Sequence, residues 1–319
     1  FVLLMIPAYI GNSNYDVYYK LDESLPKDLA FNVANNDLAK KFGITSPEII
    51  IMDKNVSSSD IESLTDELKS VKGIDLVLSP SEFVNNGLET IIPDNLQEIL
   101  NNDKYQLVLT NSTYEIASDD LNNQLTAINK IVHKYDKKAI VAGEGALMKD
   151  LITIADHDFN MVNYTSLAVI FIIMVLVLKS LSLPVVLSLV IEFAIFVNMS
   201  IAYYSGTSLP FIASIVVGTI QLGATIDYAI LMSTKYIEER QKNDSKQKCM
   251  EETLKFTIPS IITSALCFFA ATASVGFYTK IDMIGSICNL LARGSLISMA
   301  SVIFILPSLL MLSLIHISE

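Results

Sequence analysis

The apolar residues of this chain are distributed in two different ways on either side of residue 161. After it, they form five nearly continuous runs that are separated by short polar segments. A helix crosses a bilayer with about 20 mainly apolar residues, so each run is long enough to span. We predict membrane-spanning helices over residues 162–178, 184–204, 211–234, 257–277 and 284–310. Residues 161–312 are therefore expected to form an α-helical, polytopic membrane domain.

Residues 11–160 carry a mixed pattern that is typical of a water-exposed α+β domain. Short apolar runs lie on either side of longer amphipathic stretches, which favours strands that flank helices. The predicted strands cover residues 47–52, 75–78, 105–109 and 139–142, and the predicted helices cover residues 59–71 and 115–135. Two β-α-β units in tandem favour a split βαβ, ferredoxin-like sandwich.

The two ends of the chain are interpreted separately. Residues 1–10 (FVLLMIPAYI) are apolar, but a helix of this length measures only about 15 Å. We interpret them as the outer end of a truncated first membrane helix rather than the remnant of a signal peptide. Residues 313–319 (SLIHISE) end the last apolar run and resemble translated sequencing-adaptor sequence, so we leave this tail out of the functional argument.

The negative charge of the chain is concentrated before residue 161. The 319 residues have a formal net charge of −12, and residues 11–160 account for all of it with 13 Lys and Arg against 25 Asp and Glu. An acidic domain argues against nucleic acid as a partner. The three cysteines all follow residue 161, so no disulfide framework is expected in this domain. The histidines are isolated in the sequence, and we expect neither a metal nor a cofactor.

The positive charges predict the orientation in the membrane. Six Lys and Arg lie in residues 235–255, and Lys179 follows the first predicted span. The intervening loops are poor in positive charge, since residues 205–210 have none and residues 278–283 have Lys280 alone. Cytoplasmic loops of membrane proteins are enriched in Lys and Arg. We therefore predict a protein of the cytoplasmic membrane whose domain 11–160 is extracytoplasmic.

The third predicted span contains an acidic residue, Asp227. A carboxylate near the middle of a bilayer costs roughly 2.5–3.5 kcal/mol on insertion scales, which makes it a functional candidate. At about 100° per residue, Thr219, Gly223 and Asp227 form one stripe along a regular helix. Small residues on such a stripe let another helix approach closely. We therefore expect Asp227 to face protein rather than lipid.

A second polar face adjoins that stripe. Gln221, Ala224, Thr225 and Tyr228 fall within an arc of about 80° on the same helix. The hydroxyl of Tyr228 is a candidate to donate to a facing carboxylate or to relay a proton through it. The alternative is that Tyr228 is a packing aromatic residue.

Two other charged residues lie within predicted spans. Glu192 is near the middle of the second span, either as a hydrogen-bonded acid that faces a neighbouring helix or as a second carrier in a proton path. Arg293 lies in the fifth span. We expect it near the outer interface, in a structural role, with its long side chain reaching toward the headgroups.

Three segments resemble the MMPL branch of the resistance–nodulation–division superfamily. They are GATIDYAILMSTKYIEER at residues 223–240, AGEGALMKDL at 142–151 and LARGSLISMASVIFILPSLL at 291–310. The resemblance covers residues 1–312. A short apolar segment, an external domain and five spans are similar to one half of such a transporter.

The resemblance implies a proton-driven transporter rather than an enzyme, which exports lipids or other hydrophobic compounds. In the family, an Asp-Tyr pair on the fourth helix is the proton relay, and here it corresponds to Asp227 and Tyr228. Candidates for supporting roles are Glu192, Gln221, Gly223 and Thr225. The family normally has two halves whose pairs hydrogen-bond to each other. The implied partners are membrane lipids, a hydrophobic substrate, and a second half or a second copy.

Three other functions compete with transport. A protein-export accessory factor of the same superfamily would act as a free-standing half beside a translocon. A sterol-sensing-like regulator would bind a ligand without moving it. An intramembrane aspartyl protease needs two membrane aspartates that share a proton. Asp227 is the one aspartate that the sequence clearly places inside a predicted span.

Overall fold

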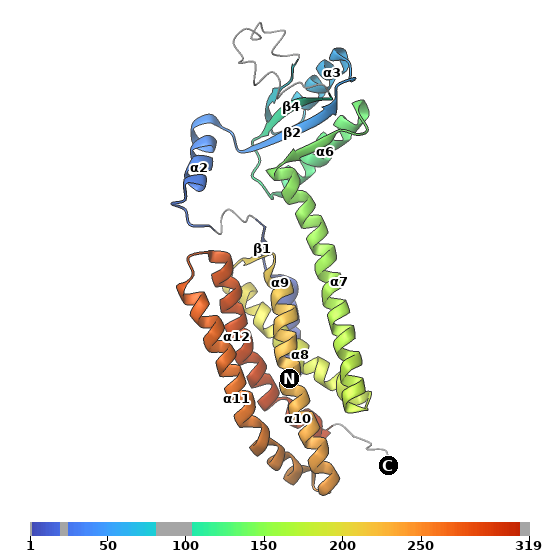
Figure 1. Cartoon of the computed structure of the whole chain (residues 1–319), viewed down its shortest axis with the longest axis vertical. Coiled ribbons are helices and arrows are strands. Elements are labelled where there is room, and N and C mark those ends of the chain that lie inside the picture. The colour runs from blue at the N-terminus through green and yellow to red at the C-terminus, as the bar shows by residue number, and fades with distance from the viewer. Residues whose placement is uncertain (1, 20–24, 81–103, 313–319) are drawn as a thin grey trace. The chain divides into compact units, whose positions relative to one another are not determined.

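The computed structural model describes residues 2–19, 25–80 and 104–312. The chain divides into two compact units, one made of Phe1–Tyr18 with Asp156–Glu319 and the other of Tyr19–Ala155. The tail 313–319 lies outside the described residues. Figure 1 shows the elements of both units.

The unit Tyr19–Ala155 contains the strands and helices predicted for the acidic domain. Its elements are α2 (Ala30–Phe42), β2 (Ser46–Asp53), α3 (Ser58–Lys69), β3 (Ile74–Leu78), β4 (Tyr105–Ser112), α6 (Asp119–Tyr135) and β5 (Ile140–Gly143). The helix predicted from residue 115 begins four residues later than expected. Ala117 has a positive φ of 62°, and the Ser118 hydroxyl caps the helix by accepting a hydrogen bond from the Leu121 N–H at 3.2 Å.

The sheet of this unit has the strand order β3-β4-β2-β5, and all neighbours are antiparallel. Alternate residues of β2 point to one face, where Ile50 and Met52 are buried. They form a single apolar core with residues from α3 and α6, including Leu64 and Leu125. From β2 onward, the described elements follow the chain order β-α-β-β-α-β, and both of these helices contribute to one core.

Counted over the described residues, five helices are long and apolar enough to cross a membrane, and they lie in the other unit except for the beginning of α7. The helices and strands of this unit, together with the whole of α7, are α1 (Val2–Ser13), β1 (Val17–Tyr18), α7 (Glu144–Leu178), α8 (Ser182–Ser205), β6 (Leu209–Pro210), α9 (Ala213–Val216), η3 (Val217–Gln221), α10 (Leu222–Lys242), α11 (Lys246–Tyr278), α12 (Asp282–Phe304) and α13 (Leu306–Leu312). Helices α10 and α12 contact each other and both α8 and α11, so that the four form a bundle (Figure 1).

Several of these helices differ in extent from the predicted spans. Helix α7 begins 18 residues before the predicted start at residue 162, and α10 and α11 continue into the charged segment between them. The last predicted span is two helices that are interrupted at Ile305. Pro307 explains the interruption, because it lacks an N–H and its ring crowds the carbonyl four residues earlier.

The apolar segment at the beginning of the chain is helical and packs on α8. The Tyr204 hydroxyl of α8 donates a hydrogen bond to the Pro7 carbonyl at 3.0 Å. The segment that follows α1 forms a short parallel pair between β1 and β6, in which Val17 lies opposite Leu209. The pair connects the end of α1 to the turn before α9.

Candidate functional site

The helix that carries Asp227 is interrupted by a π-helical turn. It consists of α9, then the π-helical turn η3 at Val217–Gln221, and then α10. A π turn contains one residue more than an α-helical turn, and single π turns inside α-helices are frequent at functional sites. The extra residue shifts the helical register by about 100°. The predicted stripe is therefore broken at Thr219, while Gly223 and Asp227 keep their common face within α10.

A fully buried set of polar side chains surrounds the end of the π turn. Asn198, Gln221, Thr225 and Ser298 are between 0% and 2% exposed. The Asn198 amide donates to the Gln221 side-chain oxygen at 2.8 Å, and Gln221 donates to the Ser298 hydroxyl at 3.1 Å. Thr225 and Ser298 share a hydrogen bond of 2.7 Å. We call these four residues, together with Arg293, the polar cluster.

Arg293 completes the polar cluster from α12. Its Nε donates to the Asn198 side-chain oxygen at 2.9 Å, and its Nη2 donates to the Asn198 carbonyl at 2.7 Å. Arg293 is the twelfth residue of α12, about 16 Å along the axis from Asp282. Asn198 holds the guanidinium between helices, which agrees with the structural role expected of Arg293, while its place near the outer interface stays a prediction.

Gly294 gives the polar cluster the space that it occupies. A Cβ at this position would lie 2.6 Å from the Gln221 side-chain oxygen and 2.7 Å from the Asn198 amide nitrogen. Any larger residue would displace the hydrogen bond between those two groups. The glycine of the LARGSL segment therefore has a structural reason within this site.

The face of α10 predicted to carry Gln221, Thr225 and Tyr228 is the buried one. All three side chains are at most 5% exposed. Asp227, in contrast, is exposed on the surface of this chain. Around Gly223, one turn earlier, a Cβ would meet no atom within 4 Å. The expectation that Asp227 faces protein is thus not met within a single chain.

The structure separates several predicted site residues. Asp227 and Tyr228 point away from one another, one exposed and one buried, and neither side chain has a hydrogen bond to another described residue. Glu192 is partly buried on α8 and likewise has no hydrogen bond or ion pair within the described ranges. The structure thus brings Gln221 and Thr225 together but does not link them to Glu192 or Asp227.

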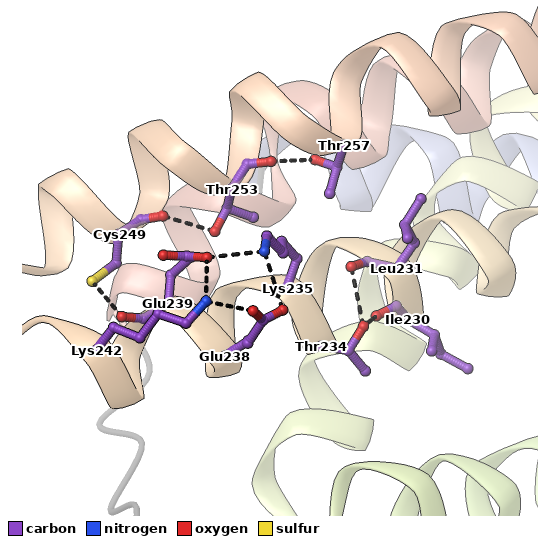
Figure 2. Close-up of polar contacts among 10 residues, drawn as sticks. All are labelled: Ile230, Leu231, Thr234, Lys235, Glu238, Glu239, Lys242, Cys249, Thr253 and Thr257. Carbon is purple, nitrogen blue, oxygen red and sulfur yellow. Dashed lines mark hydrogen bonds and ion pairs between the residues drawn. The ribbon is translucent and has the colours of Figure 1, made fainter.

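The charged end of α10 is neutralised by its own residues. Lys235 pairs with Glu238 at 3.1 Å and with Glu239 at 2.9 Å, and Lys242 binds the same two glutamates (Figure 2). The Cys249 thiol of α11 donates to the Glu239 carbonyl at 3.3 Å. The ion pairs lie within α10, whereas the Cys249 hydrogen bond joins the beginning of α11 to the end of α10.

The unit Tyr19–Ala155 contains a buried acid that the sequence did not single out. Glu48 lies on the core-facing side of β2 and is 1% exposed. Burial raises its pKa to about 7, although its carboxylate accepts a hydrogen bond from the Ala146 N–H at 3.2 Å. A Cβ at Gly143 or Gly145 would lie 2.0 Å or 2.3 Å from the Glu48 oxygens. The GEG sequence therefore makes room for this carboxylate at the beginning of α7.

Asn198 and Ser298 were also missed at the level of sequence. Both are polar residues within apolar runs, and a polar residue in a spanning helix usually hydrogen-bonds to another helix. That signal was present, but Asn198 and Ser298 are 100 residues apart along the chain. Nothing in the spacing indicated that they meet at Gln221.

The MMPL family model matches residues 61–313 of this chain. The chain belongs to the MMPL family. The match includes α10 and the whole polar cluster, so this site lies within the part that the family shares.

One relative of this MMPL protein is the membrane protein MJ1562 of Methanocaldococcus jannaschii. The two are 24% identical over 363 aligned residues, which cover 99% of this chain and 90% of MJ1562. The remaining tenth of MJ1562 is too short to contain a second region as long as this chain.

Proposed function

We propose that this MMPL protein is a transporter of the resistance–nodulation–division type, which uses the proton-motive force to export lipids or other hydrophobic compounds across the cytoplasmic membrane. Asp227 is its proton carrier and Tyr228 its relay partner. The observation that carries the proposal is an acid exposed on a spanning helix, two residues after Thr225 of the buried polar cluster.

The exposure of Asp227 supports a second protein surface at this position. A carboxylate that faces lipid near the middle of a span costs roughly 2.5–3.5 kcal/mol, whereas one that faces protein or enclosed water costs less. The open space at Gly223 lets another helix approach the same face. The length of MJ1562 supports a second copy as the source of that helix.

The protonation of Asp227 provides the driving event in this proposal. A proton that enters neutralises the carboxylate and lowers the free energy of packing it against an apolar helix, and its release restores the charge. Moving one charge through 100 mV supplies about 2.3 kcal/mol. The polar cluster ties α8, α10 and α12 together, so a movement of α10 is passed to the bundle as a whole.

We further propose that the unit Tyr19–Ala155 is a ferredoxin-like, porter-type domain outside the membrane. Its β-α-β-β-α-β order and its strand order β3-β4-β2-β5 support this assignment. The positive charges of residues 235–255 support a cytoplasmic location for the turn between α10 and α11.

Flux measurements in proteoliposomes test the proposal. The chain is reconstituted with a lipid-like fluorophore under an imposed pH gradient, and Asp227→Asn is compared with Asp244→Asn, the same change in the exposed turn after α10. We expect gradient-dependent flux that Asp227→Asn abolishes and Asp244→Asn retains. Flux at the unchanged rate in Asp227→Asn would contradict the relay. Ligand binding without flux would instead favour a regulatory or accessory role.

A further inference from the structure

Arg293 is a cation in a spanning helix, and it has no counter-ion among the residues that the structure describes. Both of its hydrogen bonds go to Asn198, and no Asp or Glu of the described ranges forms an ion pair with it. A guanidinium without a counter-charge is costly inside a bilayer, and charged groups there pair with one another or mark a ligand path. The Asn198 carbonyl satisfies part of the guanidinium, and an anion from outside the described part of the chain would neutralise its charge.

A cleft between α11 and α12 provides access to Arg293. It has a volume of about 530 Å³, which lies in the range of small-molecule sites. Its walls are mainly apolar and aromatic, and its two polar lining residues come from α12. The residues that define it are Phe269, Ala273, Phe277, Asn289, Arg293 and Leu296.

Asn198 fixes the orientation of the guanidinium. It is 0% exposed and holds Arg293 through both its side-chain and its main-chain oxygen. Those two bonds use Nε and Nη2 and leave the Nη1 donors free of any bond to the described residues. A planar guanidinium with free donors at the edge of a cleft is well suited to carboxylate or phosphate oxygens.

We propose that the cleft between α11 and α12 binds the anionic headgroup of an amphiphile, with Arg293 on the carboxylate or phosphate and the aromatic wall on the adjoining alkyl chain. This proposal rests on the proposed function in one respect, namely that the bound amphiphile is the compound that is transported. A charged headgroup together with an apolar chain matches the composition of the cleft, whereas a neutral lipid leaves the charge of Arg293 unpaired.

Lipid quenching measures this preference directly. The chain has no Trp, so Phe277→Trp places a single fluorescent reporter at the cleft. The full chain is reconstituted in phosphatidylcholine vesicles that contain brominated phosphatidylglycerol or brominated phosphatidylcholine. We expect the anionic lipid to bind about tenfold more tightly than the zwitterionic lipid, because the choline ammonium of phosphatidylcholine already neutralises its own phosphate.

Three variants in this background separate the site from general charge effects. Arg293→Gln is expected to remove the preference for the anionic lipid. Ala273→Leu leaves Arg293 and Asn198 in place but fills the cleft, so it should weaken quenching by both lipids even if Arg293→Gln fails to fold. Lys280→Gln removes a positive charge from the exposed loop that follows α11 and should retain the preference.

The outcomes distinguish the site from the transport proposal. Equal binding of the two lipids, or an unchanged preference in both Arg293→Gln and Ala273→Leu, would overturn the site. Displacement of the lipid by inorganic phosphate would replace the amphiphile with a free anion and would also overturn it. A preference that depends on Arg293, in a protein without gradient-driven flux, would retain the site and reject the export function.

Discussion

At the scale of single residues, Glu48 is a buried acid whose charge is unfavourable in the folded protein. Burial raises its pKa from 4.5 to about 7. The folded state therefore binds a proton between these two values that the unfolded state has released. Because the folded state holds the extra proton, stability falls as pH rises through this window and is constant above it. The GEG sequence provides the space but does not remove this cost.

We predict that the unit Tyr19–Ala155 loses roughly 2–3 kcal/mol of stability between pH 4.5 and pH 7. Hydrogen exchange of β4 amides in the full chain, corrected for intrinsic exchange rates, measures this change. Glu48→Gln should remove the pH dependence, because it replaces the carboxyl with a neutral group of similar shape. A slope that is equally steep in Glu48→Gln would show that another group titrates.

A matched pair of glycines tests the space around the polar cluster. Gly294→Ala should destabilise the protein by about 1–3 kcal/mol, because the added methyl displaces the buried hydrogen bond between Asn198 and Gln221. Gly223→Ala adds the same methyl in open space and should be neutral or stabilising by up to about 1 kcal/mol. Unfolding in mixed SDS micelles compares the two. Equal changes in stability in the two variants would mean that the close packing at Gly294 does not contribute to the stability of the protein.

At the scale of the elements, Asn198 is the residue that connects three helices. Its amide bonds to Gln221 and to the Leu290 carbonyl, and its oxygens accept from Arg293. Together these bonds hold α8 against the π turn and α12. Gln221, the last residue of the π turn, is thus held by side chains from α8 and α12.

We predict that Asn198→Leu destabilises the bundle by about 2–4 kcal/mol, because it leaves Gln221 and the Arg293 guanidinium without their buried partner. Ser188→Ala on the same helix is the control, since the buried Ser188 hydroxyl has no hydrogen-bond partner among the described residues. It should change stability by less than about 0.5 kcal/mol. SDS unfolding measures both variants. A mild effect of Asn198→Leu would show that water or neighbouring groups replace its bonds.

At the scale of the whole molecule, the exposed face of α10 predicts an assembly of two copies. Gly223→Phe adds a ring where the single chain has no atom within 4 Å of a Cβ, so it should not destabilise one copy. If a second copy packs on this face, the same ring should weaken association at least tenfold. Energy transfer between labelled copies, measured as the protein is diluted with lipid, follows this association.

The control for that experiment is Leu189→Phe, which also places a phenyl ring at an exposed position, on α8. It should leave association unchanged. Association that is insensitive to Gly223→Phe would remove the second copy from the Asp227 face.

Much of the fold could be predicted from local patterns. Helices within the membrane unit follow from apolar runs of sufficient length, and the strands and helices of the acidic unit follow from short alternating segments. Their ends were less predictable. A cap at Ser118 and a break before Pro307 depend on local geometry, whereas the long extension of α7 joins a polar segment to an apolar one without any break.

The sequence by itself determined which residues are chemically unusual in this protein, namely Asp227, Glu192, Gln221 and Arg293, because a polar group in an apolar run is costly wherever it is placed. Only the tertiary structure decided which partner, if any, compensates each polar group for the loss of water. Gln221 and Arg293 hydrogen-bond to Asn198, a residue from another helix, while Asp227 is left exposed. The reason is that a helix period assigns residues to faces, but a π turn changes the period and the neighbouring helices decide which face is covered.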